Sequence, residues 1–204
     1  MYNFPKIKIL RGKALNYILE NYKWILGVAI IIGLALASIV FINDYKLKKQ
    51  EKSVYYEDKA IFEGFYNNNI TLALNYLKKV PKDSYAYKRA KFLEYKYTNK
   101  EKLKNFLNEQ SLLALNSKDI YTGYLIDKRK YKKALDLALS VSLNDYIFPD
   151  TTLYGFESAL FVDKNMAKDF YAQIQSNFPN TLYQAIAFIL ALENNLTLNF
   201  EVTK

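Results

Sequence analysis

The sequence predicts an all-α protein in which one N-terminal transmembrane helix precedes an α-solenoid of about four helix pairs plus a capping helix. Three observations predict this class. One uncharged apolar stretch is long enough to cross a bilayer, helix-forming residues dominate the rest of the chain, and short helical segments recur there about every 30 to 35 residues. We therefore divide the chain into a basic cytoplasmic arm (1–23), a transmembrane helix (24–43), a charged helical linker (44–53) and a helical repeat domain (54–204).

The proposed membrane span is the stretch 24–42, nineteen residues without a charge. As a helix rising about 1.5 Å per residue it covers roughly 28 Å, close to the roughly 30 Å of a bilayer's hydrocarbon core. Aromatic rings favour the headgroup layer, and Tyr22, Trp24 and Tyr45 stand at the edges of the stretch. We therefore expect a lipid bilayer around this segment.

Two alternatives compete with a permanent anchor. The small residues Ala35 and Ala37 fit the cleavage pattern of a secretory signal peptide, but the apolar run continues to Ile42 and more than twenty residues precede it. A helix that is apolar on every face could instead be buried in a soluble protein, but it would need a large domain around it, and the chain has 204 residues. The uncleaved anchor fits the sequence best.

The charges that flank the span bear on its orientation. Five basic residues and one acidic residue precede Asn43, so +4 of the net charge of +9 lies before it and +5 after it. Lysines at positions 46, 48, 49 and 52 nearly balance the upstream basic residues, so the positive-inside rule favours a cytoplasmic N-terminus only slightly. A large soluble domain can translocate regardless of such charges. We expect the N-terminus inside and the C-terminal domain outside the cytoplasm.

Small residues recur every four positions within the span. Ala29, Gly33 and Ala37 share one line of the expected helix. Such a line lets a second helix approach closely in lipid, where packing replaces the hydrophobic effect as the driving force. We interpret these residues as a contact with a membrane protein complex, and the alternative is a span with no specific partner, because Gly and Ala are common in spans.

Composition excludes several kinds of chemistry. The chain has neither Cys nor His, which removes disulfides, thiolate nucleophiles, cysteine-type zinc sites and the commonest general base. Its six glycines are isolated, so there is no Gly-rich phosphate loop. The carboxylates are scattered, and no pair of them occupies a catalytic motif. We predict no catalytic residue, no cofactor and no metal site, and we do not expect an enzyme.

One basic run raises the possibility of nucleic-acid binding. Five basic residues fall within 128–133, and the chain contains 19 tyrosines whose rings could stack on bases. Lysines on helix faces usually face solvent, however, and tyrosines at helical spacing usually belong to the core. We expect no nucleic-acid partner.

Residues 54–193 are predicted to form paired short helices. The pairs are 54–66 with 70–80, 84–97 with 100–107, 111–126 with 130–139 and 151–162 with 165–178, and a last helix opens at an Asn180-Thr181 cap and ends near Glu193. The second helices begin near residues 70, 100, 130 and 165, a period in the tetratricopeptide range. The Trp, Leu, Gly, Tyr consensus of that repeat is missing, so the match is degenerate. A single pair cannot bury its apolar face, so neighbouring pairs must stack.

A stack of helix pairs presents a concave surface formed largely by the first helix of each pair, and we expect a partner there. In the second pair, one face of the first helix is predicted to be core, with Ala86, Ala90, Leu93 and Tyr97. The other face carries aromatic and basic residues, including Arg, and aromatic and Arg side chains are enriched in interface anchors. The candidate partner groove consists of Tyr85, Arg89, Phe92 and Lys96, with Tyr121 and Tyr124 in the next pair. For each of them, a place in the core is the alternative.

The stretch Asn21–Gly27 (NYKWILG) enters the span, and Ala-rich repeat helices follow it. Together with the basic arm, the single span and the charged linker, this layout resembles the ancillary SecYEG translocon subunit family of bacterial inner-membrane proteins. The resemblance implies a periplasmic domain that associates with the translocon and with folding factors, such as chaperones, or with emerging client proteins. The strong Lys, Asn and Tyr bias of this chain departs from the family pattern.

We therefore expect a single-pass protein of the bacterial inner membrane that acts as a protein-interaction module near a membrane machine. Two alternatives stay open. The chain could be a scaffold for another envelope complex, such as a motor, a division site or a respiratory assembly. It could also be an enzyme accessory subunit, or a hydrolase whose carboxylates match no pattern that we recognise.

Overall fold

The computed structural model describes residues 5–109 and 111–197. Within these ranges the chain is helical and contains no strand, which confirms the all-α class predicted from the sequence. The chain divides into two compact units, Met1–Val54 and Tyr55–Lys204.

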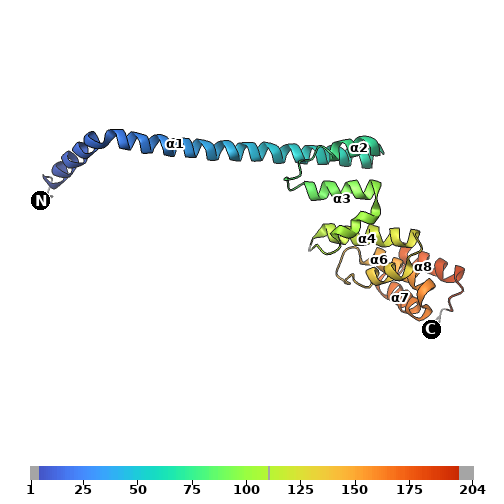
Figure 1. Ribbon diagram of the computed structural model, residues 1–204. Helices are drawn as coiled ribbons and strands as arrows, with labels where there is room; N and C mark the ends of the chain where they lie inside the picture. The colour runs from blue at the N-terminus through green and yellow to red at the C-terminus, as the bar shows by residue number, and fades with distance from the viewer. Residues whose placement is uncertain (1–4, 110, 198–204) are drawn as a thin grey trace. The chain divides into compact units, whose positions relative to one another are not determined.

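The first unit contains most of helix α1 (Pro5–Ile61), which Figure 1 shows as one long helix. One segment of α1 is long and apolar enough to cross a membrane, and none of it is buried within the protein. The side chain of Trp24, for example, is 79% exposed. The alternative of an apolar helix buried in a soluble domain is therefore wrong for the part of the chain that the structure describes. A signal sequence meets the same criteria of length and composition, so the choice of an uncleaved anchor stays a prediction.

The second unit begins with the last turns of α1 and continues through short helices, which follow one another in chain order in Figure 1. After α1 come the π-helix η1 (Phe62–Tyr66), α2 (Ile70–Leu77), α3 (Tyr87–Thr98), the 3-10 helix η2 (Lys100–Phe106), α4 (Leu112–Asp127), α5 (Tyr131–Ala138), α6 (Phe148–Val162), α7 (Lys164–Asn177) and α8 (Leu182–Glu193). The predicted helix over 54–66 is the end of α1 followed by η1, and the predicted helix over 100–107 has 3-10 rather than α geometry.

Polar side chains fix some of the helix starts. Asn69 and Asp163 accept hydrogen bonds from backbone N–H groups three and two residues further on, at 3.1 and 2.8 Å, and so cap α2 and α7. Thr181 occupies the cap position of α8 without making such a bond, and its hydroxyl donates to the Phe178 carbonyl at 2.7 Å. The predicted cap position at Asn180 and Thr181 is confirmed, since Thr181 is the N-cap residue of α8.

In the second unit, helices pack against their neighbours in sequence and against the next helix but one. α4 contacts α5 and α6, α6 contacts α7 and α8, and α3 contacts η2 and α4. The first helices of three successive pairs, α3–η2, α4–α5 and α6–α7, are therefore adjacent to one another in space. This succession of α3, α4 and α6 positions the candidate site.

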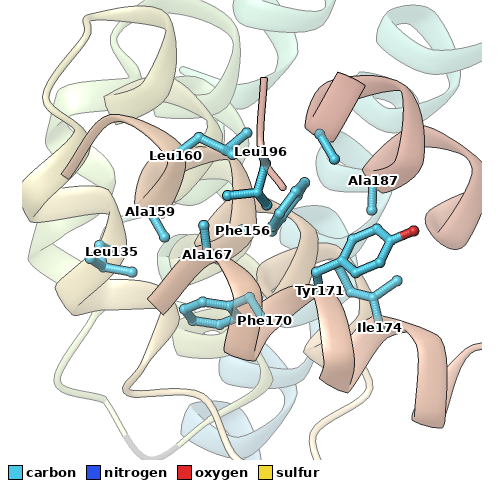
Figure 2. Close-up of a cluster of buried hydrophobic side chains, with 11 residues drawn as sticks. Leu135, Phe156, Ala159, Leu160, Ala167, Phe170, Tyr171, Ile174, Ala187 and Leu196 are labelled. Carbon is cyan, nitrogen blue, oxygen red and sulfur yellow. The ribbon is translucent and has the colours of Figure 1, made fainter. Parts of the chain in front are cut away.

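The largest core cluster joins α5, α6, α7 and α8, and Figure 2 shows its side chains gathered between these helices. Phe156 of α6, Ile174 of α7 and Ala187 of α8 are fully buried in it. Gly155 permits a close approach of α7, because a Cβ placed on it would lie 2.5 Å from Cε1 of Phe170. The cluster thus holds α6 firmly, and other residues of α6 line the candidate site.

Two smaller clusters hold the N-terminal half of the second unit. One contains Ala60, Ala73 and Ala90, and the other contains Phe92 and Phe106, whose rings pack edge to face with centroids 6.1 Å apart. The predicted core face of α3 is confirmed: Ala86, Ala90, Leu93 and Tyr97 all belong to the first of these clusters or pack against it.

Candidate functional site

A cleft of about 440 Å³ lies along α3, α4 and α6, with one edge formed by the start of η2. Its volume falls in the range of roughly 300–1,000 Å³ that is usual for ligand pockets. The three α-helices are the first helices of successive pairs. The lining comprises Lys96 and Tyr97 from α3, Lys100 from η2, Asp119, Ile120, Gly123, Tyr124, Ile126 and Asp127 from α4, and Tyr154 and Glu157 from α6.

Helix α4 contributes a polar row to the cleft. Asp119, Gly123 and Asp127 are spaced at i, i+4 and i+8, which places them on one side of the helix. A Cβ built on Gly123 would lie 3.4 Å from Cζ and Oη of Tyr154. A side chain longer than alanine at position 123 would therefore extend into the space between the two carboxylates and the Tyr154 ring.

Helix α6 contributes a second polar row at i, i+4 and i+7, consisting of Asp150, Tyr154 and Glu157. Asp150 lies at the end of this row and accepts a hydrogen bond from the Tyr183 hydroxyl of α8 at 2.9 Å. That bond joins the first turn of α6 to α8. The α4 row and the Tyr154 and Glu157 side chains of α6 line the same cleft, and the two helices are in contact.

The Asp119 carboxylate is the most perturbed acid in the cleft. Its Oδ1 is buried and has no hydrogen-bond partner among the described residues. Burial, and then the charge of Asp150, raise the pKa of Asp119 to about 6, while Lys96 of α3 opposes this shift. The side chains of Tyr146, Tyr154 and Tyr183 also belong to the electrostatic surroundings of Asp119, because the pKa of each phenol is raised mainly by burial and further by the charge of Asp119.

Negative charge also acts on the α6 side of the cleft. Burial, followed by the charges of Asp119 and Asp150, raises the pKa of Tyr154 to about 12. Burial, followed by the charge of Asp127, raises the pKa of Glu157. In the described part of the chain, none of the three lining carboxylates, at positions 119, 127 and 157, forms an ion pair. Their charges are therefore only partly compensated by the protein itself.

The opposite edge of the cleft is basic. Lys96 in the last turn of α3 and Lys100 at the start of η2 both belong to the lining. Lys96 acts on Asp119 electrostatically without coming within ion-pair distance of it. The cleft thus has an acidic side formed by α4 and α6 and a basic edge formed by α3 and η2, which is suited to a ligand that carries groups of both kinds.

Two of the six residues predicted for the partner groove line this cleft, namely Lys96 and Tyr124. A third, Tyr121, stacks on Tyr124 with ring centroids 5.9 Å apart and packs against the cluster that contains Phe92. It therefore supports the wall of the cleft from outside the lining.

The other three predicted groove residues lie elsewhere. Phe92 is 7% exposed and belongs to a core cluster, so its assignment to an open groove is wrong and the core alternative holds. Arg89 makes two hydrogen bonds of 2.6 Å to the buried carboxylate of Glu57 and joins α3 to α1. Tyr85 precedes α3 and is 61% exposed, but it is not part of the cleft.

Sequence reasoning missed most of the polar residues of the cleft. The signal was present in the helix-face spacing of Asp119 with Asp127 and of Tyr154 with Glu157. A search for catalytic pairs within short motifs could not find it, because the two rows come from helices about thirty residues apart in the chain.

The predicted packing line in the membrane segment is open in this structure. Ala29, Gly33 and Ala37 are all exposed, and no atom lies within 4 Å of a Cβ built on Gly33. Its contact with another membrane helix stays a prediction.

Fold and cleft together define the class of this chain as an all-helical protein with one helix able to cross a membrane and a polar cleft on its second unit. No protein-family model, curated protein or solved structure matches the chain. Across residues 5–109 and 111–197, no group of three or more His, Cys, Asp or Glu residues could hold a metal ion.

Proposed function

We propose that this protein is a membrane-anchored interaction module and that its cleft holds a segment of a partner protein. One observation carries the proposal: the cleft is lined by the first helices of three successive pairs, α3, α4 and α6. This is the surface on which stacked helical repeats hold extended partners. A cleft on the concave side of a solenoid binds by complementarity and needs no catalytic group.

A tetratricopeptide-like solenoid is the architecture that we propose for the second unit. It is supported by the contacts of α4 with α6 and of α6 with α8, each of which joins a helix to the next but one. Such a succession is expected when each pair stacks on its neighbour. In this proposal α8 is the capping helix, because no described helix follows it.

For the location, we propose the bacterial inner membrane, with the N-terminus in the cytoplasm and the second unit in the periplasm. The proposed machine is the protein translocon, and the proposed cleft ligands are folding factors or emerging clients. These proposals rest on the resemblance in layout and on the membrane-length segment of α1.

The test of the cleft as the binding surface uses the full chain. Gly123→Phe places a ring in the space beside Tyr154, and Tyr124→Ala removes part of the wall without adding bulk. Lys168→Phe is the matched control, because Lys168 is exposed on α7, outside the cleft. Each variant is expressed in cells, the membranes are solubilised in a mild detergent, and the co-purified proteins are identified and quantified.

Both cleft variants should lose a membrane-complex partner that the wild type and Lys168→Phe retain. Circular dichroism and membrane fractionation must show that each variant remains helical and inserted. Full retention of every partner by a folded Gly123→Phe protein would show that the cleft is not the binding surface.

The membrane segment is tested separately with Gly33→Leu. Leucine is at least as apolar as glycine, so insertion should be unchanged, while its bulk should force a packed helix away. Co-purification of the translocon should fall without loss of the protein from the membrane. Unchanged co-purification would show that this line of small residues has no role in binding the complex.

A further inference from the structure

We infer that a second copy of this chain docks on the outer face of α8, so that two α8 helices pair antiparallel about a two-fold axis. The inference goes beyond the proposed function, because α8 contributes no residue to the cleft along α3, α4 and α6. Three observations on α8 carry it: an exposed apolar stripe, the spacing of that stripe, and the position of the one charged residue of the helix.

The first observation is that α8 is apolar on its outer side as well as on its core side. Ala187 and Ala191 are fully buried in the largest core cluster, in which Figure 2 labels Ala187. On the outer side, Leu182, Ile189 and Leu192 are 74%, 53% and 58% exposed. A helix that is apolar all round is normally buried, and the last unit of a helical stack normally has a polar outer face. The outer face of α8 therefore has the character of a buried surface, and no described residue buries it.

The second observation is the spacing of the stripe, which consists of Leu182, Ala185, Ile189 and Leu192. These residues follow one another at intervals of three, four and three, and they lie within about 80° of one another around the helix axis. The intervals are those of the a and d positions through which helices pair, and they read the same in both directions. An antiparallel second copy therefore places its Leu192 opposite Leu182 and its Ile189 opposite Ala185.

The surface beside Ala185 is hollowed where this pairing needs space. A groove of about 540 Å³ lies between α7 and α8, and its lining includes Ala185 of α8 together with Tyr171 and Gln175 of α7. Ile189 of the second copy lies opposite the small Ala185 side chain and so enters this hollow. The pairing thus sets a large side chain against a small one on each side of the two-fold axis.

The third observation is charge, which selects the antiparallel arrangement. Glu193 is the only charged residue among the twelve of α8, and it is exposed. The first turn of α8 has no acidic residue, and its N-cap residue Thr181 makes no capping hydrogen bond. In the antiparallel pair, Glu193 of each copy lies beside Thr181 of the other, where the helix dipole favours a negative charge. The two carboxylates then lie roughly 18 Å apart along the helices, whereas a parallel pair would bring them together.

The size of the stripe indicates where the pair forms. At about 30 Å² per CH₂ group, its three large side chains offer roughly 250 Å² of apolar surface per copy, less than the roughly 800 Å² per partner of a stable interface. The pair is therefore weak in dilute solution, and it forms when two copies anchored in one membrane meet at a high effective concentration. A bilayer fits the stripe less well, because helices that lie on a membrane carry Lys or Arg on their polar face and α8 has neither.

The experiment is cysteine cross-linking of the full-length chain in membranes, and the chain has no Cys of its own to interfere. Two differently tagged copies are co-expressed, one with Leu182→Cys and one with Leu192→Cys, and the membranes are treated with a mild oxidant. The mixed disulfide, which carries both tags, should form at least about fivefold more than the disulfide of either variant with itself. In the antiparallel pair positions 182 and 192 face each other, whereas the two copies of position 182 lie about 15 Å apart along the helices, beyond the reach of a disulfide. Dilution in detergent before oxidation should reduce the mixed disulfide.

The control pair is Leu112→Cys with Leu139→Cys, because both leucines are exposed and lie outside α8. It should give no mixed disulfide. Adding Ile189→Lys to both cross-linking copies should reduce the mixed disulfide about tenfold, because the pair would then bury a charge. Ile189→Lys in the Leu182→Cys copy, combined with Ala185→Glu in the Leu192→Cys copy, should restore it, because these two positions face each other. Such a recovery excludes misfolding as the cause of the loss.

Three outcomes would overturn the inference: no mixed disulfide above the control pair, equal amounts of mixed and like-with-like disulfide, or no recovery with the Lys and Glu substitutions. Maleimide labelling of Leu192→Cys identifies another occupant. Protection that is lost when residues 198–204 are deleted would assign the face to the chain's own C-terminus, and protection in membranes without a mixed disulfide would assign it to a different protein. Either result overturns the second copy.

The inference and the proposed function fail separately. Ile189→Lys should leave intact the partner capture that Gly123→Phe abolishes, because position 189 lies outside the cleft. If Gly123→Phe abolishes capture while no mixed disulfide forms, the proposed function stands and the second copy falls. If the mixed disulfide forms while Gly123→Phe retains every partner, the second copy stands and the cleft is not the binding surface.

Discussion

Replacing Phe92 by alanine distinguishes a core residue from a groove residue on α3. Phe92 is 7% exposed, and its ring packs edge to face against Phe106, with the ring centroids 6.1 Å apart. Truncating such a buried ring typically costs about 3–5 kcal/mol, of which an aromatic pair accounts for roughly 0.5–1.5 kcal/mol. Tyr85 is the contrasting residue, because it is 61% exposed, and its ring lies 5.9 Å from the Arg89 guanidinium. An exposed contact of that kind contributes about 0.5–1 kcal/mol.

The assay is urea unfolding of the full-length protein in nonionic detergent, followed by far-UV circular dichroism. With a urea slope of about 2 kcal/mol per M, a loss of about 3–5 kcal/mol lowers the midpoint by roughly 1.5–2.5 M. Phe92→Ala should show a drop of that size, while Tyr85→Ala should move the midpoint by less than about 0.5 M. Equal small shifts for both variants, with unchanged slopes, would refute the placement of Phe92 in the core.

Three further predictions concern the same unit, and each is read from the unfolding free energy. Between about pH 4 and 6 the folded state holds a proton on Asp119 that the unfolded state has released, so the contribution of Asp119 to stability falls as pH rises. Solvent screening reduces this contribution because the carboxyl is only half buried, and Asp119→Asn should remove a fall of about 1–2 kcal/mol from the profile; an unchanged profile would contradict the raised pKa. Gly155→Ala should destabilise, because overpacking against Phe170 costs about 1–3 kcal/mol and exceeds the roughly 1 kcal/mol gain in helix propensity; a more stable variant would show that the ring moves freely. Arg89→Gln should cost about 3 kcal/mol and more than Glu57→Gln, because it leaves the buried Glu57 carboxylate without its cation, and the reverse order would contradict the burial of that carboxylate.

Much of the helical framework follows from local sequence. The uncharged stretch 24–42 is apolar along its whole length, which predicts an apolar helix. The structure contains this helix, and it is not buried within the protein. Asn and Asp residues that can accept a hydrogen bond from the backbone start α2 and α7, at Asn69 and Asp163. The periodic small residues of α3, such as Ala86 and Ala90, predicted its buried face. These features depend on contacts within a few residues, which spacing along the chain reports directly.

The spacing of residues along α3 gave wrong positions for side chains that contact a second neighbouring element. Phe92 lies off the main apolar face of α3, so the hydrophobic periodicity of the helix suggested a surface position. In the structure η2 packs against that side and buries the Phe92 ring beside Phe106. Arg89 was a plausible interface anchor, but Glu57 of α1 binds it with two hydrogen bonds. Helix α3 contacts α2, η2 and α4, so it has a second buried face although its hydrophobic periodicity marks only one.

The acidic side of the cleft illustrates what a single helix cannot predict. Asp119 and Asp127 look like solvent-facing charges on α4, and Glu157 looks the same on α6, because each helix alone offers them water. Contact between α4 and α6 removes part of that water and brings the carboxylates together, which is why burial is the largest cause of the raised pKa of both Asp119 and Glu157. Gly123 costs α4 about 1 kcal/mol of helix propensity relative to alanine, and its position opposite Tyr154 gives that cost a physical reason. In this chain, the glycine inside α4 that has an acid four residues away on either side marks the point where the Tyr154 ring of α6 approaches α4.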